Sequence, residues 1–212
     1  GGAQGDSDTV VINVSAVNDA PVNVVPLAQS VNEDTGLSIT GLSVSDVDST
    51  SGTVILSVAH GTVTVAASAG VTITNSGTSS VTLSGTFAAI NSALSATNGV
   101  VYQGASNYNG SDTLTIATSD GTATTTSTVG VTVVAVNDAP VNTVPGTQSA
   151  TEDTDKAITG LSLSDVDAGS SPVTVTLSVA HGSLTVLAAS GVSITGSGTS
   201  SVVLSGSITD IN

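Results

Sequence analysis

The stretch VNDAPVN occupies residues 17–23 and recurs letter for letter at residues 136–142. Two further motifs return 119 residues later: NEDT (32–35) as TEDT (151–154), and GLSVSDVD (41–48) as GLSLSDVD (160–167). LSVAHG also returns, at an offset of 121, so the second copy has gained two residues in the loop that follows SDVD. Repetition at a fixed period is the sequence signature of a repeat architecture.

The repeats divide the chain into three parts. Residues 17–135 form one complete repeat, and residues 136–212 form a second repeat that stops early relative to the first. Residues 1–16 contain TVVINVSA at 9–16, which resembles TVGVTVVA at 128–135 and likewise runs into VNDAPVN. We therefore expect residues 1–16 to be the last strand of a preceding repeat, and the chain to be a window on a longer tandem array.

The pattern inside a repeat predicts β-strands. Apolar and polar residues alternate in seven segments of the first repeat, as they do in half-buried strands, and Gly, Asn and Asp fall between the segments. Residues 87–96 differ, because Phe87, Ile90, Ala93 and Leu94 have helical spacing. Roughly seven strands in about 120 residues is typical of an Ig-like sandwich. We expect an all-β fold of tandem antiparallel Greek-key β-sandwiches, with one short helix per repeat.

Composition excludes several classes of partner. The formal net charge is −15, with Lys156 as the only basic residue, so the chain would repel nucleic acids and anionic membranes. No apolar run reaches the length of a transmembrane helix, and there is no cysteine for a disulfide or a thiolate metal site. No pairing of a nucleophile with a base is visible, so we do not expect an enzyme.

The order of the strands predicts where the acids gather. If successive strands alternate in direction, Asn18, Asp19, Asp46, Asp48 and Asp120 meet at one end of the first repeat. At the junction with the next repeat, residues from both copies would meet: Glu33, Asp112, Asn137, Asp138, Asp165 and Asp167, with Glu152 as the counterpart of Glu33. Converging carboxylates repel one another unless a cation lies between them. Ca²⁺ accepts six to eight oxygen ligands in flexible geometry, so we predict Ca²⁺ at these positions.

These residues resemble the calcium motifs of cadherins: SDVD as a DxD motif, SDG in the last hairpin, NEDT as the first calcium-binding acid, and VNDAPV as the linker. The chain is more similar to bacterial cadherin-like tandem repeats of large, RTX-type, calcium-binding surface adhesins, over nearly its whole length. The resemblance implies an extracellular protein on a bacterial cell surface. Its repeats would be stiffened by Ca²⁺ at their linkers and would extend an adhesion or biofilm apparatus.

Two alternatives stay open at this point. The repeats could assemble into an extracellular filament or sheath by strand exchange between copies, with residues 9–16 as the donated strand. A carbohydrate-binding module is the other alternative, although the sequence lacks the aromatic residues that such sites commonly use. The expected partners are the neighbouring repeats of the same chain, other copies of the chain, or a host or biofilm surface.

Overall fold

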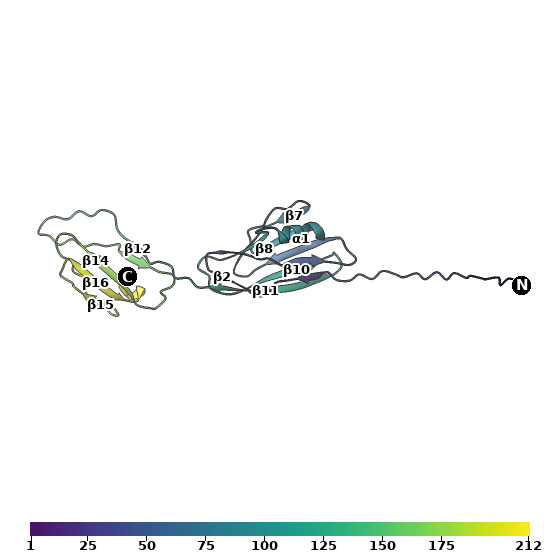
Figure 1. Ribbon diagram of the computed structural model, residues 1–212. Helices are drawn as coiled ribbons and strands as arrows, with labels where there is room; N and C mark the ends of the chain where they lie inside the picture. The colour runs from purple at the N-terminus through teal and green to yellow at the C-terminus, as the bar shows by residue number, and fades with distance from the viewer. The chain divides into compact units, whose positions relative to one another are not determined.

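The computed structural model describes residues 1–212, which divide into two compact units, 1–135 and 136–212 (Figure 1). The division falls between Ala135 and Val136, where the second VNDAPVN begins.

Unit 1 contains eleven strands and one helix. In chain order they are β1 (Val22–Val24), β2 (Gln29–Asn32), β3 (Gly36–Ser38), β4 (Ser43–Ser45), β5 (Ser51–Ser57), β6 (Gly61–Val65), β7 (Val71–Thr74), β8 (Ser80–Thr86), α1 (Phe87–Ser95), β9 (Val100–Gly104), β10 (Gly110–Ser119) and β11 (Thr124–Val134). Six strands form one sheet in the order β2-β11-β10-β5-β8-β7, three form a sheet in the order β3-β9-β6, and β1 pairs with β4.

The core of unit 1 is a single cluster of apolar side chains shared by these sheets and α1. Leu56, Leu83 and Ile116 reach it from the six-stranded sheet, and Val63 and Tyr102 reach it from the three-stranded sheet. All five side chains have no exposed surface. Because the alternating pattern of each strand turns one face inward, aliphatic side chains fill this core almost without aromatic residues.

Helix α1 confirms the predicted helix at 87–96. The Thr86 hydroxyl accepts a hydrogen bond from the backbone amide of Ala89, which caps the first turn. The predicted apolar row, Phe87, Ile90, Ala93 and Leu94, is the row that the helix buries. Helical spacing placed these four side chains on one face, and the core covers that face.

The predicted strand LSITGLSVSD is divided in the structure. Gly41 has a φ of 83°, a left-handed conformation that interrupts a strand. The part of the segment before Gly41 becomes β3, which pairs with β9. The part after Gly41 becomes β4, which pairs with β1. One segment of sequence therefore contributes to two sheets, and strands β1, β2 and β9 were not among the seven segments predicted.

The expectation of a fully antiparallel arrangement is wrong at one pair. Strand β2 pairs with β11 in parallel, with Val31 opposite Val133, whereas every other strand pair is antiparallel. Parallel partners need a long connection, and here nearly the whole unit lies between the two strands. Sequence alternation does not reveal strand direction, so this pair could not be predicted.

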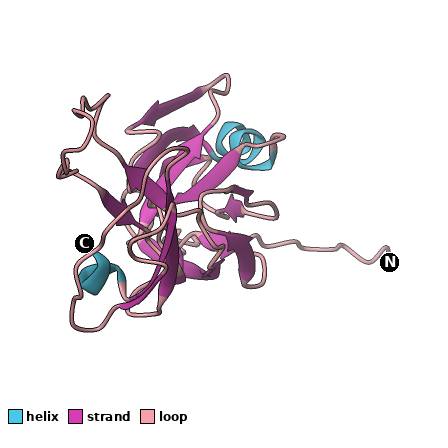
Figure 2. Cartoon of the chain, turned by 90° about the vertical axis from the view of Figure 1, so that its left-hand side faces the viewer, coloured by secondary structure: helices cyan, strands magenta, loops and turns pink.

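Residues 1–20 form no helix or strand and are exposed (Figure 2). The strand expected at 9–16 is therefore not formed in this structure. A strand needs a hydrogen-bonded partner, and no strand of the chain pairs with this segment.

Unit 2 repeats part of unit 1. Its elements are β12 (Val141–Thr143), β13 (Ser162–Ser164), β14 (Val173–Ser178), β15 (Ser193–Thr195), β16 (Ser201–Gly206) and α2 (Ile208–Ile211). Strand β12 pairs with β13 in the register of β1 with β4, and β14 pairs with β16 in the register of β5 with β8. The sequence repeat is thus also a structural repeat.

The core of unit 2 is more open than that of unit 1. Its buried hydrophobic side chains are Leu163, Val202 and Leu204, because residues 136–212 contain no counterparts of β9, β10 and β11. The sheet therefore ends at β14, whose counterpart β5 lies between β10 and β8 in unit 1. The fold of the chain is all-β with two short helices, and neither helix could span a membrane.

Candidate functional site

Five polar residues meet at one end of unit 1 and are called the linker cluster here: Asn18, Asp19, Asp46, Asp48 and Asp120. Strand β1 runs antiparallel to β4, with Val22 opposite Ser45. This pairing places the residues before β1 beside the residues after β4. The turn between β10 and β11 reaches the same place, so three distant segments meet there.

Two hydrogen bonds join the linker to the body of the unit. The side-chain amide of Asn18 donates to Oδ2 of Asp120 at 2.9 Å, and the backbone amide of Asp19 donates to Oδ2 of Asp48 at 2.7 Å. The linker is thereby connected to two different loops. The sequence-based argument about strand direction predicted this meeting of residues, and the structure brings all five together.

Asp46 is the innermost member of the linker cluster. Its Oδ1 accepts hydrogen bonds from the backbone amides of Asp48 at 2.8 Å and Ser49 at 2.7 Å. Its Oδ2 is buried and has no hydrogen-bond partner. Buried carboxylate oxygens nearly always have a partner in folded proteins, and a bound ion or water is a common explanation when the protein supplies none. Asp46 Oδ2 is therefore the oxygen that a cation would approach.

Asp120 is held as a carboxylate by the turn that contains it. Its Oδ1 accepts hydrogen bonds from the backbone amides of Thr122 and Ala123, both at 2.6 Å. The bond from Ala123, the Asn18 side chain and the bond from Thr122 together lower the pKa of Asp120 below its ordinary value. The residue is consequently anionic at neutral pH.

The same arrangement recurs in unit 2. Asp165 Oδ1 accepts hydrogen bonds from the backbone amides of Asp167 at 2.8 Å and Ala168 at 2.9 Å, and Asp167 Oδ2 accepts one from Asp138. The Asn137 side chain donates to the Asp138 carbonyl, as Asn18 does to Asp19. Four of the predicted ligands thus meet in each unit with equivalent contacts.

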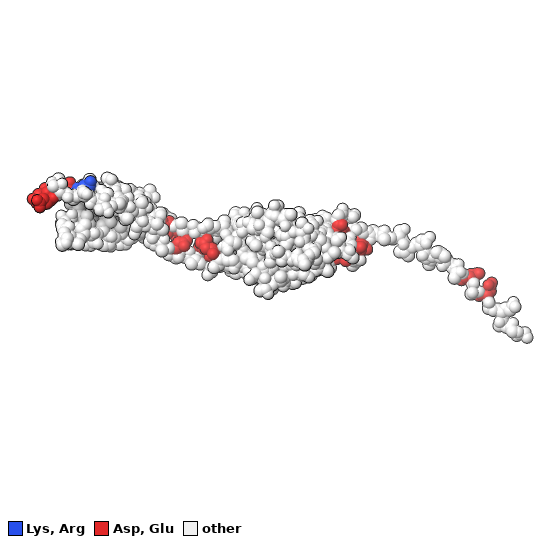
Figure 3. All heavy atoms as spheres, turned by 90° about the horizontal axis from the view of Figure 1, so that it is seen from above, with Lys and Arg blue, Asp and Glu red and all other residues white.

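Unit 1 supplies no basic side chain to its linker cluster, because Lys156, the only one in the chain, belongs to unit 2. On the face of unit 1 shown in Figure 3, acidic side chains lie at the two ends of the sandwich and in the extended N-terminal segment, and the surface between the two ends is uncharged. No group of three His, Cys, Asp or Glu side chains is arranged as a metal centre. A cation here would also need oxygens from Asn18 and backbone carbonyls, which are ligands that Ca²⁺ accepts.

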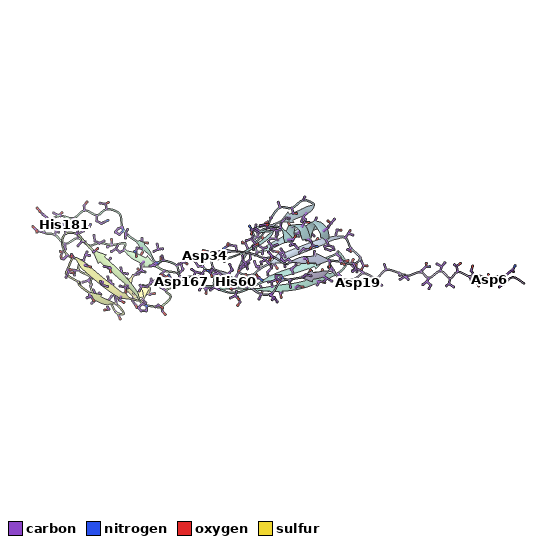
Figure 4. All side chains as sticks on the ribbon, viewed as in Figure 1. Asp6, Asp19, Asp34, His60, Asp167 and His181 are labelled. Carbon is purple, nitrogen blue, oxygen red and sulfur yellow. The ribbon has the colours of Figure 1, made fainter.

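The opposite end of unit 1 carries Glu33 and Asp112. Figure 4 shows Asp19 at one end of the unit and Asp34 and His60 at the other. Glu33 follows β2 and is only 5% exposed. The predicted meeting of these acids with those of the second repeat involves both units and stays a prediction.

Asp112 has a structural role that the sequence did not reveal. It is 4% exposed, and it accepts hydrogen bonds from the backbone amides of Ala59, His60 and Thr113 and from the Tyr102 hydroxyl. Burial by itself would raise its pKa, but these four hydrogen bonds lower the pKa below its ordinary value. Both oxygens are used by the protein, so we do not include Asp112 in the proposed cation site.

The remaining predicted ligand, Glu152, is exposed in a turn of unit 2. Sequence reasoning missed Asn91, whose side chain accepts from the Val44 amide and donates to the Val44 carbonyl, both at 2.8 Å. Asn212 makes the same pair of bonds to Leu163. The signal was present, because IN recurs at 90–91 and 211–212, and these contacts fix the strand that ends directly before Asp46 or Asp165.

Residues 38–129 match the model of the Protein GAMETE EXPRESSED 2 domain, a eukaryotic gamete protein family. The match lies within unit 1 and covers less than half of the chain. It includes Asp46, Asp48 and Asp120 but not Asn18 or Asp19. No curated protein matches the chain at the threshold of significance.

This match corrects the identification made from the sequence. The chain is similar to a eukaryotic domain family, and the identification as a bacterial cadherin-like repeat of RTX-type adhesins is wrong. The expectations of a bacterial source and of a role in biofilms are therefore wrong as well. The match gives no support to calcium binding. Motifs such as SDVD and VNDAP consist of residues that favour turns in many β-proteins, which is why they identified the family poorly.

Proposed function

We propose that the chain is a structural repeat region of an extracellular adhesion protein, in which the linker cluster binds Ca²⁺ and thereby holds the linker against its sandwich. The observation that carries this proposal is the buried Oδ2 of Asp46, which has no hydrogen-bond partner and lies among residues of like charge.

The proposed fold of each unit is an Ig-like Greek-key β-sandwich. A six-stranded and a three-stranded sheet share one core in unit 1, and the first and last strands of the larger sheet lie side by side. Such a fold brings loops together at its two ends. A repeat built in this way can carry a cation site in its end loops without any change in its core.

The chemistry of the linker cluster favours Ca²⁺ over other cations. The candidate ligands are carboxylate, amide and carbonyl oxygens, and no cysteine or histidine belongs to the cluster. Mg²⁺ requires a strict octahedron and gives up its water reluctantly, whereas Ca²⁺ tolerates irregular sets of six to eight oxygens. Extracellular modules bind Ca²⁺ with dissociation constants of about 10⁻⁴ to 10⁻³ M, which suits a site of mixed ligands.

The mechanical consequence follows from the two bonds that already hold the linker. A cation shared by Asp46, Asp48 and Asp120 would cancel their mutual repulsion and strengthen the attachment of residues 18–19 to two loops. A flexible connection would become a fixed one. The proposed role is that of a spacer whose stiffness depends on extracellular Ca²⁺, with the neighbouring repeats as its first partners.

The test is urea unfolding of the whole chain at a series of Ca²⁺ concentrations, with tyrosine fluorescence as the signal. Both tyrosines lie in unit 1 and there is no tryptophan, so this signal reports unit 1 alone. At a Ca²⁺ concentration a hundred times the dissociation constant, we expect stabilisation by about 2.7 kcal/mol. Asp46→Asn should remove most of that gain, and Asp8→Asn, an equal change of charge in an exposed segment, should leave it intact.

The proposal fails if unit 1 unfolds at the same urea concentration in EDTA and in Ca²⁺ at a hundred times the dissociation constant, or if the Asp46 and Asp8 variants respond alike. Equal responses would mean that Ca²⁺ acts on the net charge and not at the linker cluster. Small-angle scattering of the chain tests the mechanical part separately. Profiles that coincide with and without Ca²⁺ would show that the cation does not stiffen the linker.

A further inference from the structure

Strand β1 reverses the usual orientation of side chains in a strand that lies on a core. Its two apolar residues, Val22 and Val24, are 56% and 54% exposed, whereas the polar residue between them, Asn23, is half-buried. Burial of a polar side chain is unfavourable unless its hydrogen bonds are formed. The partners of the Asn23 side chain therefore decide how β1 is attached to the sandwich.

The side-chain amide of Asn23 bonds to two other strands. Its nitrogen donates to the backbone carbonyls of Ile116 at 3.3 Å and Thr125 at 3.0 Å, and its oxygen accepts from the Thr118 hydroxyl at 2.6 Å. The first and last of these partners belong to β10, and Thr125 lies opposite Thr118 in β11. Backbone carbonyls can only accept, so only this orientation of the amide satisfies all three partners. Thr118 has no exposed surface, so its bond to Asn23 is a buried polar contact between β1 and β10.

Asn23 connects the linker to the hairpin that carries Asp120. Along the chain it is four residues after Asp19, and its partner Thr118 is two residues before Asp120. Two extended residues span roughly 7 Å, so the contact lies close to the turn that contains Asp120. The bond from Asn23 to Thr118 thus holds the start of β1 beside the end of β10.

Strand β4 is held at the same level by a second asparagine. Val44 lies opposite Asn23 in the β1–β4 pair and two residues before Asp46, and both of its backbone groups bond to the Asn91 side chain of α1. The pair is only three residues long. Without the Asn23 side chain, it would keep its attachment to the helix and lose these hydrogen bonds to the hairpin that carries Asp120.

We propose that Asn23 is a positioning residue of the Ca²⁺ site: its side chain sets the distance between residues 18–19 and the Asp120 turn, and thereby the affinity of unit 1 for Ca²⁺. This role rests on the proposed function, because it concerns the same linker cluster. Replacing a residue that orients the ligands of a metal commonly lowers the affinity by about ten- to a hundredfold. Asn23→Val removes all three hydrogen bonds and should cause a loss of this size.

The test is a Ca²⁺ titration of the whole chain, with the nuclear magnetic resonance signal of the Ser49 backbone amide as the readout. This amide donates to Asp46 Oδ1, and its equivalent in unit 2, the Ala168 amide, donates to Asp165 Oδ1. In Asn23→Val the dissociation constant measured at Ser49 should rise by about ten- to a hundredfold. The response at Ala168 is the internal control and should not change.

Two substitutions at Thr118 separate positioning from stability. Thr118→Val removes the hydroxyl and keeps the size of the side chain, so it should weaken Ca²⁺ binding as Asn23→Val does. Thr118→Ser keeps the hydroxyl and removes a buried methyl group, so it should lower the urea midpoint of unit 1 and leave the Ca²⁺ affinity unchanged. If Asn23 only stabilised the fold, affinity would follow the urea midpoint in both variants. The Thr118 variants test the same bond even if Asn23→Val does not fold.

Hydrogen exchange in EDTA gives a second reading that needs no Ca²⁺. The backbone amide of Asp19 bonds to Asp48 Oδ2, and it should exchange faster in Asn23→Val and in Thr118→Val because β1 no longer holds the linker in place. The Ala89 amide, in the first turn of α1, is the control and should keep its exchange rate.

Loss of the Ca²⁺ site and loss of the role of Asn23 give different results. A wild-type chain that binds no Ca²⁺ in unit 1 would overturn the proposed function and, with it, the role of Asn23. A wild-type chain that binds Ca²⁺ no more tightly than Asn23→Val would overturn the role of Asn23 alone. Equal affinities in the two Thr118 variants, or an unchanged exchange rate at Asp19, would do the same.

Discussion

Replacing Asp112 by alanine should destabilise unit 1 more than any change to a surface carboxylate. The side chain is 4% exposed and accepts hydrogen bonds from the backbone amides of Ala59 at 3.1 Å, His60 at 2.9 Å and Thr113 at 2.7 Å, and from the Tyr102 hydroxyl at 3.0 Å. These bonds join the β5–β6 connection to β9 and β10. The methyl group of alanine can accept none of them.

The loss of stability caused by Asp112→Ala can be estimated from the hydrogen-bond donors that lose their acceptor. A hydrogen bond to a charged group contributes about 1.5 to 3 kcal/mol, and the amides of Ala59 and His60 would both lose such a bond. The Tyr102 hydroxyl keeps a weaker alternative, because it also lies 3.2 Å from the His60 carbonyl. We therefore expect a loss of about 3 to 5 kcal/mol in the free energy of unfolding, which is a large part of the total stability of a domain.

Urea unfolding followed by tyrosine fluorescence measures this loss in unit 1. Asp112→Asn retains one acceptor oxygen and should lose about half as much, and Asp8→Ala, at an exposed residue of unit 1, should change stability by less than about 0.5 kcal/mol. If Asp112→Ala costs less than about 1 kcal/mol, the four hydrogen bonds do not stabilise the fold as argued.

The pKa values of Asp112 and Asp120 are lowered in the folded state, so their contribution to stability is complete above the ordinary aspartate pKa of 3.8 and is lost as pH falls through the lower folded values. The urea midpoint should therefore be constant near neutral pH and decrease below about pH 4. An unchanged midpoint down to about pH 2 would contradict this. Gly52→Ala should destabilise unit 1 by more than about 2 kcal/mol, because the added Cβ would lie 2.4 Å from the Ser119 carbonyl oxygen. Gly130→Ala is the control, because a Cβ at that position would make only ordinary van der Waals contacts. Equal decreases in melting temperature for the two variants would refute this prediction.

The identity of the core-facing residues was readable from local pattern. The row of Phe87, Ile90, Ala93 and Leu94 requires only helical spacing, and each alternating segment requires only a period of two. The assumption that successive strands alternate in direction predicted that Asp19 would lie near Asp48 and Asn18 near Asp120. Those contacts depend on which way each strand runs, and a chain of short connections leaves few choices.

Other features depended on tertiary contacts. The sequence alone determined the repeat, the strand-rich composition and the concentration of acids in turns, because these are properties of residue order. Only the folded structure decided that Gly41 sends one segment into two sheets, that β2 lies parallel to β11, and that Asp112 accepts four hydrogen bonds while Asp46 keeps one buried oxygen without a partner. All of these follow from residues far apart in the chain, whose hydrogen bonds exist only after the sheets have packed.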